Sequence, residues 1–337
     1  MNETEFETEL RNDVEATELS FYMSGVIEEL KRDGKFPAAH IYACTLRSFK
    51  SFAGSGGSGS GLLLHEVFTP GRLKEYENWL LAVRELSLNT VSTYMRTLQA
   101  VYHRWMPSGS PGYNPKLFAD VYTRVVSQTK RALTGQQVNK LMSTDLDTLP
   151  VQLQCVCAYF LLMVLFRGMP FIDLAHLRKC DVQGNLIVYR RHKTGKQMTV
   201  HIPREAVGLI KAFRDKNPQS VYLFPVLDAR LRGGRPLYEC YQAALRRFNR
   251  LLEKLMQILL PGVKVSSYTA RHTWATLAFH LGIPVGIICQ SLGHSSVRVT
   301  ETYLKPFENE RVDRANRKLI STVFKPKGGN RKIYNAL

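Results

Sequence analysis

Residues 265–306 read VSSYTARHTWATLAFHLGIPVGIICQSLGHSSVRVTETYLKP, and this stretch decides how the second half of the chain folds. Apolar residues recur in it at offsets of three, four and seven, which predicts an amphipathic helix that Gly282 ends. The same spacing predicts a second helix that ends at Gly293, after which two serines can cap a third helix that carries Tyr303. The expected apolar positions are Trp274, Leu277, Ala278 and Leu281 in the first helix and Val285, Ile288, Cys289 and Leu292 in the second.

Three polar side chains, Arg271, His294 and Tyr303, lie at the junctions of these predicted helices. Arginine and histidine can donate hydrogen bonds to a phosphate, and a phenol held beside them can attack it. A single Arg, His or Tyr at a helix end is usually a surface or capping residue, so it is the ordered set that is informative. The set A-R-H-T-W-A-T, then L-G-H-S-S, then T-E-T-Y-L resembles the carboxy-terminal signature of the tyrosine recombinase (phage integrase) family.

The charge of the chain predicts a polyanionic partner. Lys and Arg number 46 against 28 Asp and Glu, which gives a net charge of +18. The first 18 residues hold seven acids and one base, Arg11, so the remaining residues carry +24. An excess of this size favours nucleic acid as the partner. The charge alone is also consistent with ribosome binding, with binding to a membrane surface or with simple solubility.

The bulk composition predicts a cytoplasmic protein of two domains. A length of 337 residues exceeds one small domain, and a hydrophobic content of 45% allows a sizeable core. No apolar run approaches the roughly 20 residues that cross a bilayer, and the acidic amino terminus MNETEFETEL lacks the apolar core of a secretory signal. The six cysteines show no metal-ligand spacing, so we expect free thiols and no bound metal.

The first half of the chain predicts a helical bundle over residues 19–115. Residues 1–18 are acidic and are expected to be disordered, and the GSGGSGSG run at 54–61 is expected to be a flexible loop. Helices are predicted from Leu19 to Gly34, after Pro37, from the Thr69-Pro70 cap, and over 86–106. Their expected apolar faces are Phe21, Val26, Ile27 and Leu30; Ile41, Leu46 and Phe49; Leu73, Tyr76, Trp79 and Leu80; and Val91, Met95, Leu98 and Tyr102. Basic side chains outside these faces favour a clamp on a DNA backbone.

The second half predicts a mixed domain over residues 134–320 that follows a linker at 116–133. Thr134 can cap a helix, and the apolar stretch VQLQCVCAYFLLMVLFRG predicts the central buried helix. In NLIVYRRHKTGKQMTVHIP, apolar residues alternate after a Lys-Thr-Gly-Lys turn, which predicts a β-hairpin. Further helices are predicted over 204–216, 239–258 and 308–320, followed by a basic tail at 321–337. The expected fold class is therefore mostly α with a small β-sheet (α+β).

This layout also resembles the tyrosine recombinases, over residues 19–320: a helical core-binding bundle, a linker, and a catalytic domain. The resemblance implies that a tyrosine attacks a DNA phosphodiester, which yields a 3′-phosphotyrosyl link and a free 5′-hydroxyl. A second strand's hydroxyl then reverses the attack, so no metal, ATP or other cofactor is expected. The implied partner is double-stranded DNA with paired recombination sites in the bacterial cytoplasm, associated with the nucleoid. A homotetramer on DNA, linked through the carboxy-terminal segment, is also implied.

The resemblance carries over to individual residues. Tyr303 corresponds to the nucleophile, and Arg271 to the second of two phosphate-clamping arginines. His294, in L-G-H-S-S, corresponds to a donor to the phosphate or to the tyrosine. Lys193, in the hairpin turn, corresponds to the lysine that protonates the leaving 5′-oxygen, and Lys196 is a possible substitute.

Two positions depart from the family pattern. The family usually has a histidine three residues before the second arginine, where this chain has Tyr268; a phenol can donate a hydrogen bond to phosphate but is a poor base at neutral pH. The usual position of the first arginine is Pro170. Arg167, about one helical turn earlier, is the predicted first arginine, and Arg178 is the reserve. R-G-M-P-F-I-D-L resembles a variant of recombinases from Bacteroidetes-type mobile elements, such as integrases and invertases, and Asp173 within it is expected to orient one arginine.

Site-specific recombination through a phosphotyrosine intermediate is therefore the predicted function, for integration, excision or inversion of DNA segments. Two alternatives remain open: a type IB topoisomerase, which shares the catalytic residues, and a DNA-binding regulator whose catalytic residues are vestigial. The DNA target and the outcome of recombination depend on where paired sites lie, which no residue encodes.

Overall fold

A computed structural model of the chain describes residues 18–55, 62–126, 131–304 and 309–323. The chain forms two compact units, Met1–Gln128 with Leu231–Glu239, and Thr129–Arg230 with Cys240–Leu337. The predictions for the acidic amino terminus, for most of the Gly/Ser run and for most of the basic tail lie outside the described residues. Within the described ranges, no helix combines the length and the apolar character that crossing a bilayer requires.

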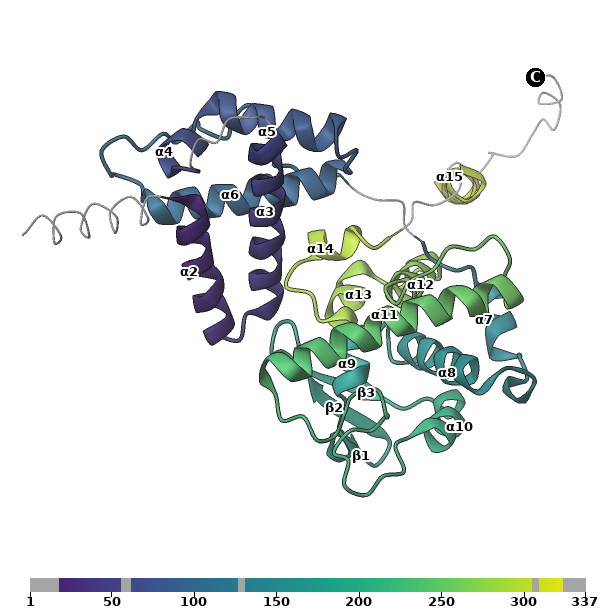
Figure 1. Cartoon of the computed structure of the whole chain (residues 1–337). Helices are drawn as coiled ribbons and strands as arrows, with labels where there is room; N and C mark the ends of the chain where they lie inside the picture. Colours follow the sequence, from purple (N-terminus) through teal and green to yellow (C-terminus); the bar gives the residue numbers. More distant parts are fainter. Residues whose placement is uncertain (1–17, 56–61, 127–130, 305–308, 324–337) are drawn as a thin grey trace, which may run out of the picture. The chain divides into compact units, whose positions relative to one another are not determined.

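The first unit is a bundle of helices (Figure 1). Its elements are α2 (Leu19–Arg32), α3 (Phe36–Ser55), α4 (Leu64–Val67), α5 (Pro70–Ala82) and α6 (Leu88–Trp105). The four predicted helices are confirmed, and the short α4 is an addition to them. Thr69 caps α5 as predicted, because its side chain accepts a hydrogen bond from the backbone N–H of Arg72. The prediction that residue 54 begins a loop is wrong, because α3 continues through Ser55.

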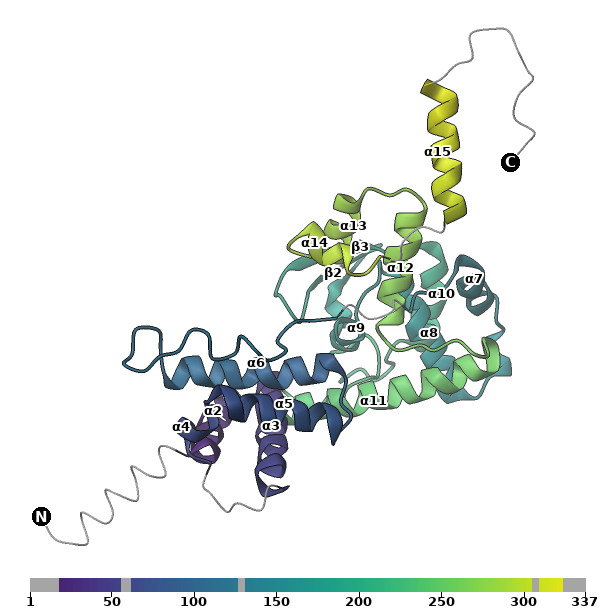
Figure 2. The ribbon, with the colours of Figure 1, turned by 90° about the horizontal axis from the view of Figure 1, so that it is seen from above.

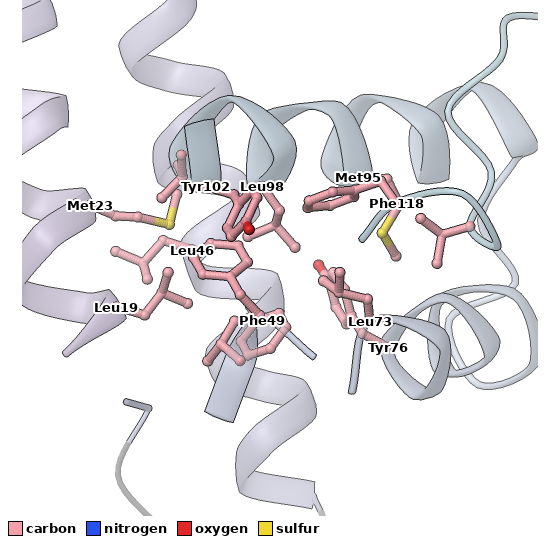
Figure 3. Close-up of a cluster of buried hydrophobic side chains, with 14 of the residues drawn as sticks. Leu19, Met23, Leu46, Phe49, Leu73, Tyr76, Met95, Leu98, Tyr102 and Phe118 are labelled. Carbon is pink, nitrogen blue, oxygen red and sulfur yellow. The ribbon is translucent and has the colours of Figure 1, made fainter. Parts of the chain in front are cut away.

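The core of this bundle contains most, but not all, of the predicted apolar residues (Figure 3). Phe49 and Tyr76 are fully buried, with ring centroids 4.8 Å apart. The predicted burial of Phe21 and Ile41 is wrong: they are 59% and 39% exposed. In α2 the buried stripe is instead Leu19, Met23, Val26 and Ile27, a helical face from which Phe21 points away. Leu117, Phe118 and Val121 are buried in the same core, so the bundle packs beyond the predicted boundary at 115.

The second unit combines helices with one small sheet, which confirms the predicted α+β class. Its helices are α7 (Gly135–Met142), α8 (Val151–Leu165), α9 (Phe171–His176), α10 (Arg204–Phe213), most of α11 (Gly234–Leu259), α12 (Thr269–His280), α13 (Val285–Leu292), α14 (Val297–Glu301) and α15 (Asn309–Val323), with short 3₁₀ turns at Leu146–Thr148 and Lys179–Asp181. The strands β1 (Val182–Gln183), β2 (Leu186–Arg190) and β3 (Gln197–His201) form an antiparallel sheet in that order. The hairpin is therefore confirmed, and Met198 and Val200 are buried as predicted.

The buried helix α8 supports the three helices formed by residues 265–306. Ten of its fifteen residues are buried, and α12 packs against it. In turn α13 packs against α12, and α14 against α13 (Figure 2). Thr134 caps α7 in a reciprocal pair of hydrogen bonds with Gln137, which confirms that cap as the start of a helix.

The three helices predicted within residues 265–306 are present, with two corrections. Leu281 is 81% exposed rather than buried, because α12 ends at His280 and leaves it in the turn. Tyr303 lies in a turn just beyond α14, which ends at Glu301, rather than on that helix. Gly293 ends α13 as predicted, in the left-handed conformation with φ +67° that favours glycine.

Candidate active site

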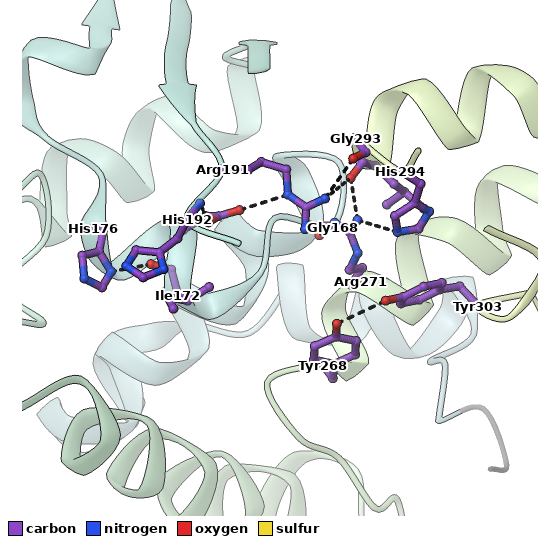
Figure 4. A network of polar contacts seen from close by, with 12 residues as sticks. Gly168, Ile172, His176, Arg191, His192, Tyr268, Arg271, Gly293, His294 and Tyr303 are labelled. Atoms are coloured by element: carbon purple, nitrogen blue, oxygen red, sulfur yellow. Dashed lines mark hydrogen bonds and ion pairs between the residues drawn. The ribbon is translucent and has the colours of Figure 1, made fainter. Parts of the chain in front are cut away.

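Arg271 is the centre of the site and is almost completely buried, with 2% of its surface exposed. Its Nη1 donates a hydrogen bond to the Gly168 carbonyl at 2.9 Å, in the turn between α8 and α9 (Figure 4). Its Nη2 donates to the Leu292 carbonyl at 2.5 Å and lies 2.9 Å from Nε2 of His294. One guanidinium therefore holds together two loops that are far apart in the sequence.

The contacts of His294 assign its tautomer. A guanidinium can only donate, so Nε2 of His294 accepts from Arg271 and the ring proton is on Nδ1. Nδ1 then donates to the hydroxyl of Thr300, 2.9 Å away and fully buried. Burial, followed by the positive charges of Arg271 and Arg191, lowers the pKa of His294 to about 4. His294 is therefore neutral at physiological pH, with an acceptor nitrogen toward Arg271.

The ring of Tyr303 is packed among the other site residues. Its centroid lies 4.9 Å from the ring of His294 and 4.9 Å from the ring of His272, and 5.5 Å from Cζ of Arg271. The Tyr303 hydroxyl lies 3.1 Å from the hydroxyl of Tyr268. Burial, followed by this hydrogen bond, raises the pKa of Tyr303 above its ordinary value, so the phenol is protonated at neutral pH.

Arg191 is a member of the site that the sequence analysis missed. It follows β2 and is 7% exposed, and its Nη1 donates to the carbonyls of Leu292 and Gly293 at 3.0 and 3.1 Å. Its Nε lies 3.5 Å from a carboxylate oxygen of Asp173. The alternation of the strand offered a signal, because the side chain of Ile187 is buried and positions 189 and 191 follow at the same period of two.

The remaining predicted residues lie around this centre. Lys193 and Lys196 are exposed in the hairpin turn, near enough to contribute to the low pKa of His294. Arg167 is half-buried, and its Nη1 lies 3.4 Å from the Thr199 carbonyl on β3. This hydrogen bond directs the guanidinium to β3, and the role of Arg167 as the first arginine stays a prediction.

Arg178, the reserve for that role, has different surroundings. It is exposed, and its backbone N–H donates to the carboxylate of Asp181. Its backbone also pairs with Tyr222 in an isolated β-bridge. None of these partners contacts Arg271 or Tyr303 among the described residues, so the structure gives Arg178 no part in the site.

The charges of the site suit an anion. Arg271 and Arg191 are buried side chains that both donate to the Leu292 carbonyl, and the carboxylate close to them is that of Asp173. The Nε atoms of both arginines lack a hydrogen-bond partner in the described part of the chain. Buried cations without full compensation are costly, and a phosphate offers both the charge and the acceptors. Among the described residues, no group of three His, Cys, Asp or Glu side chains is placed to hold a metal ion.

Comparisons with known proteins agree with this geometry. Residues 131–310 match the family model described as "Phage integrase family", and residues 18–109 match the model described as "Phage integrase SAM-like domain". The tyrosine recombinase XerA of Thermococcus kodakarensis is 28% identical over 205 residues, which are 60% of this chain and 67% of that protein. The protein of the same name from Pyrococcus furiosus is 27% identical over 194 residues, 55% of this chain and 62% of that protein.

Solved structures share the fold at low sequence identity. The Tn1549 transposon integrase in complex with transposon right end DNA has a TM-score of 0.64 at 14% identity, covering 90% of this chain and 99% of that one. The XerH site-specific recombinase bound to palindromic difH substrate, in a post-cleavage complex, has a TM-score of 0.61 at 16% identity. The match covers 86% of this chain and 83% of that one. The two family models together cover most of the chain and include every residue of the site. The chain therefore belongs to the phage integrase family of tyrosine recombinases, enzymes that cleave and rejoin DNA at specific sites.

Proposed function

We propose that this chain binds double-stranded DNA at paired recombination sites and cleaves it with Tyr303 as the nucleophile. The observation that carries the proposal is the position of the Tyr303 ring, packed on His294 and beside the buried guanidinium of Arg271. A scissile phosphate bound by Arg271 would therefore lie next to the phenol. The XerH and Tn1549 structures hold DNA, which supports DNA as the substrate of this chain.

The proposed reaction is a transesterification. The Tyr303 oxygen attacks phosphorus, and the bond from phosphorus to the 5′-oxygen breaks, which leaves a 3′-phosphotyrosyl link. Arg271 stabilises the charge that develops on the nonbridging oxygens, since a guanidinium held in place by the protein needs no reorganisation. Lys193 protonates the departing 5′-oxygen, with Lys196 as the alternative donor in the same turn. Attack by the 5′-hydroxyl of another strand reverses these steps and rejoins the DNA.

Tyr268 completes the proposed proton pathway. The phenol of Tyr303 is protonated at neutral pH, so it must lose its proton as it attacks. The hydroxyl of Tyr268 lies 3.1 Å away and can accept that proton while it donates its own to a phosphate oxygen. Neutral His294 contributes by fixing the orientation of Arg271 through its Nε2 atom.

Assembly and location are part of the same proposal. The helix α15 exposes the apolar side chains of Val312, Leu319 and Ile320. A second copy of the chain could cover these side chains in a homotetramer on DNA, which is the assembly that the family resemblance implies. The reaction would take place on nucleoid DNA in the bacterial cytoplasm, for integration, excision or inversion of a segment.

A trapping experiment tests the proposal. The DNA site is first selected from a random pool by binding to the full chain, and is then nicked close to the scissile phosphate so that the cleaved fragment diffuses away. The wild type should accumulate a covalent protein–DNA adduct that resists denaturation. Tyr303→Phe should form none and should bind the site almost as tightly, because a hydroxyl is lost but no charge. The absence of an adduct with the wild type would refute the enzymatic proposal, and an adduct with Tyr303→Phe would refute the choice of nucleophile.

A further inference from the structure

The side chains of two adjacent arginines point in opposite directions at the end of β2. Arg190 is exposed, and its Nη1 donates to the Gly195 carbonyl in the turn at 3.2 Å. Arg191 is 7% exposed and is directed toward the α13–α14 loop (Figure 4). Because successive side chains of a strand alternate between its faces, only the second arginine enters the site.

Arg191 and Arg271 meet at one carbonyl. Nη1 of Arg191 and Nη2 of Arg271 both donate to the oxygen of Leu292, at 3.0 and 2.5 Å. Arg191 also donates to Gly293, at the carboxy-terminal end of α13, where helix carbonyls carry partial negative charge. A Cβ at Gly293 would lie 3.0 Å from Cδ of Arg191 and 2.8 Å from Sδ of Met198, so glycine is what allows this close approach.

The two guanidinium groups carry more positive charge than the nearby carboxylate can balance. Asp173 is the carboxylate near Arg191, and the 3.5 Å between its Oδ2 and Nε of Arg191 is too long for a hydrogen bond by the usual criterion of about 3.2 Å. Neither of these two atoms has a hydrogen-bond partner in the described chain, and neither has Nε of Arg271. Burial, followed by the positive charge of Arg191, lowers the pKa of Arg271. An anion with several acceptor oxygens would relieve this imbalance.

We propose that Arg191 is the first of the two phosphate-clamping arginines and acts together with Arg271. The family pattern gives this role to an arginine at the position of Pro170. The inference rests on the proposed cleavage of DNA by Tyr303. It replaces Arg167 in that role, because the Nη1 atom of Arg167 is directed to the Thr199 carbonyl whereas Arg191 shares an acceptor with Arg271. The β-hairpin thus delivers both the arginine and, two residues later, Lys193.

Single-turnover cleavage of the nicked substrate tests this role in the full chain. Arg191→Met should lower the cleavage rate constant on the order of 100-fold, the usual loss when one preorganised donor to a transition-state charge is removed. The cleavage rate constant of Arg191→Lys should lie between those of Arg191→Met and the wild type. Lysine keeps the positive charge but loses the planar pair of N–H donors that a guanidinium offers to a phosphate. The matched control is Arg190→Met, which removes the same charge from the exposed face and should stay within about threefold of the wild type. Equal rates for Arg191→Met and Arg190→Met would overturn the inference.

A second substrate separates charge neutralisation from structural support. A methylphosphonate at the scissile position replaces one nonbridging oxygen with a methyl group, so the transition state carries less negative charge. The ratio of wild-type to Arg191→Met rate constants should then fall at least about tenfold relative to the phosphodiester, because less charge needs a partner. An unchanged ratio on the two substrates would mean that Arg191 only holds the α13–α14 loop, and would overturn the proposed role.

The controls keep this test apart from the proposed function. If the wild type forms no adduct on either substrate, the proposed function fails, whereas an active wild type with an unaffected Arg191→Met refutes Arg191 alone. Thermal melting shows whether each variant folds. If Arg191→Met does not fold, Arg191→Lys and Arg190→Lys are compared instead. A loss of cleavage rate that is confined to Arg191→Lys and is smaller on the methylphosphonate supports the inference. Equal cleavage rates for Arg191→Lys and Arg190→Lys contradict it.

Discussion

The hydroxyl oxygens of Tyr268 and Tyr303 lie 3.1 Å apart, and either can be the donor. Tyr268 stands where the family pattern usually has a histidine. It is 47% exposed at the start of α12, while Tyr303 is half-buried against His294. The bond therefore connects the predicted nucleophile to a side chain that is partly open to solvent.

The hydroxyl of Tyr268 should matter for cleavage and little for folding. Tyr268→Phe removes the hydroxyl that is proposed to accept the proton of Tyr303, so the single-turnover cleavage rate constant should fall on the order of 100-fold, the lower end of the usual range for loss of a proton-transfer group. Tyr268→His should retain activity, since an imidazole can also donate to phosphate. Rates on the nicked substrate decide this, with DNA affinity measured in parallel. Equal activity of the Phe and His variants would leave Tyr268 a packing role.

The lysine that protonates the leaving oxygen can be identified with a modified substrate. Lys193 and Lys196 lie in the same exposed turn, so the contacts alone do not separate them. Lys193→Met should slow cleavage of ordinary DNA by about 100-fold, within the usual range for loss of a general acid. A sulfur in place of the 5′-oxygen makes a leaving group that needs no proton, so Lys193→Met should recover on that substrate. Lys196→Met serves as the control, and a recovery seen with it instead would assign the role to Lys196.

Gly168 should be intolerant of a side chain because of Arg271. Its φ is +68°, and a Cβ there would lie 3.0 Å from Cα of Arg271, a backbone atom in a buried helix. Gly184 has a similar φ of +61° and nothing within 4 Å, so it is a matched control. Gly184→Ala should cost about 1–2 kcal/mol in free energy of unfolding, the cost of a left-handed backbone. Gly168→Ala should cost at least about 1 kcal/mol more, because the helix must also shift.

Urea unfolding of both variants gives this comparison, and cleavage assays extend it. Gly168→Ala should also slow cleavage, since its carbonyl accepts a hydrogen bond from the guanidinium of Arg271, whereas Gly184→Ala should not. Equal losses of stability in the two variants would show that the turn between α8 and α9 adapts to a methyl group.

Local patterns predicted the elements better than the faces that they bury. The caps at Thr69 and Thr134 mark helix starts because each side chain bonds to its own backbone within a few residues. The face of α2 was misjudged because Phe21 is as apolar as Met23, and only tertiary packing selects between two possible stripes.

The sequence motif in residues 265–306 similarly located Arg271, His294 and Tyr303, but it did not predict every side chain that contacts them. Arg191 escaped because a charged residue at the end of a strand is usually assigned to solvent. Its acceptors at Leu292 and Gly293 lie about a hundred residues further along the chain, and no short-range pattern connects them. The contact depends on how the hairpin packs against the end of α13, which is a property of the folded domain.

The low pKa of His294 predicts how the stability of the protein depends on pH. The folded pKa is about 4 against an ordinary value of 6.5, so between these values the unfolded chain binds a proton that the folded chain does not. The free energy of unfolding should therefore rise as pH rises from 4 to 6.5, and this contribution should be constant above that window. His294→Gln has no such proton, so its stability should decline less than that of the wild type on acidification from about pH 7 to about pH 4.5. Urea unfolding of both proteins across this range measures the difference. Parallel pH profiles would mean that His294 titrates alike in the folded and unfolded chains, and that the neutral acceptor assigned to it beside Arg271 is incorrect.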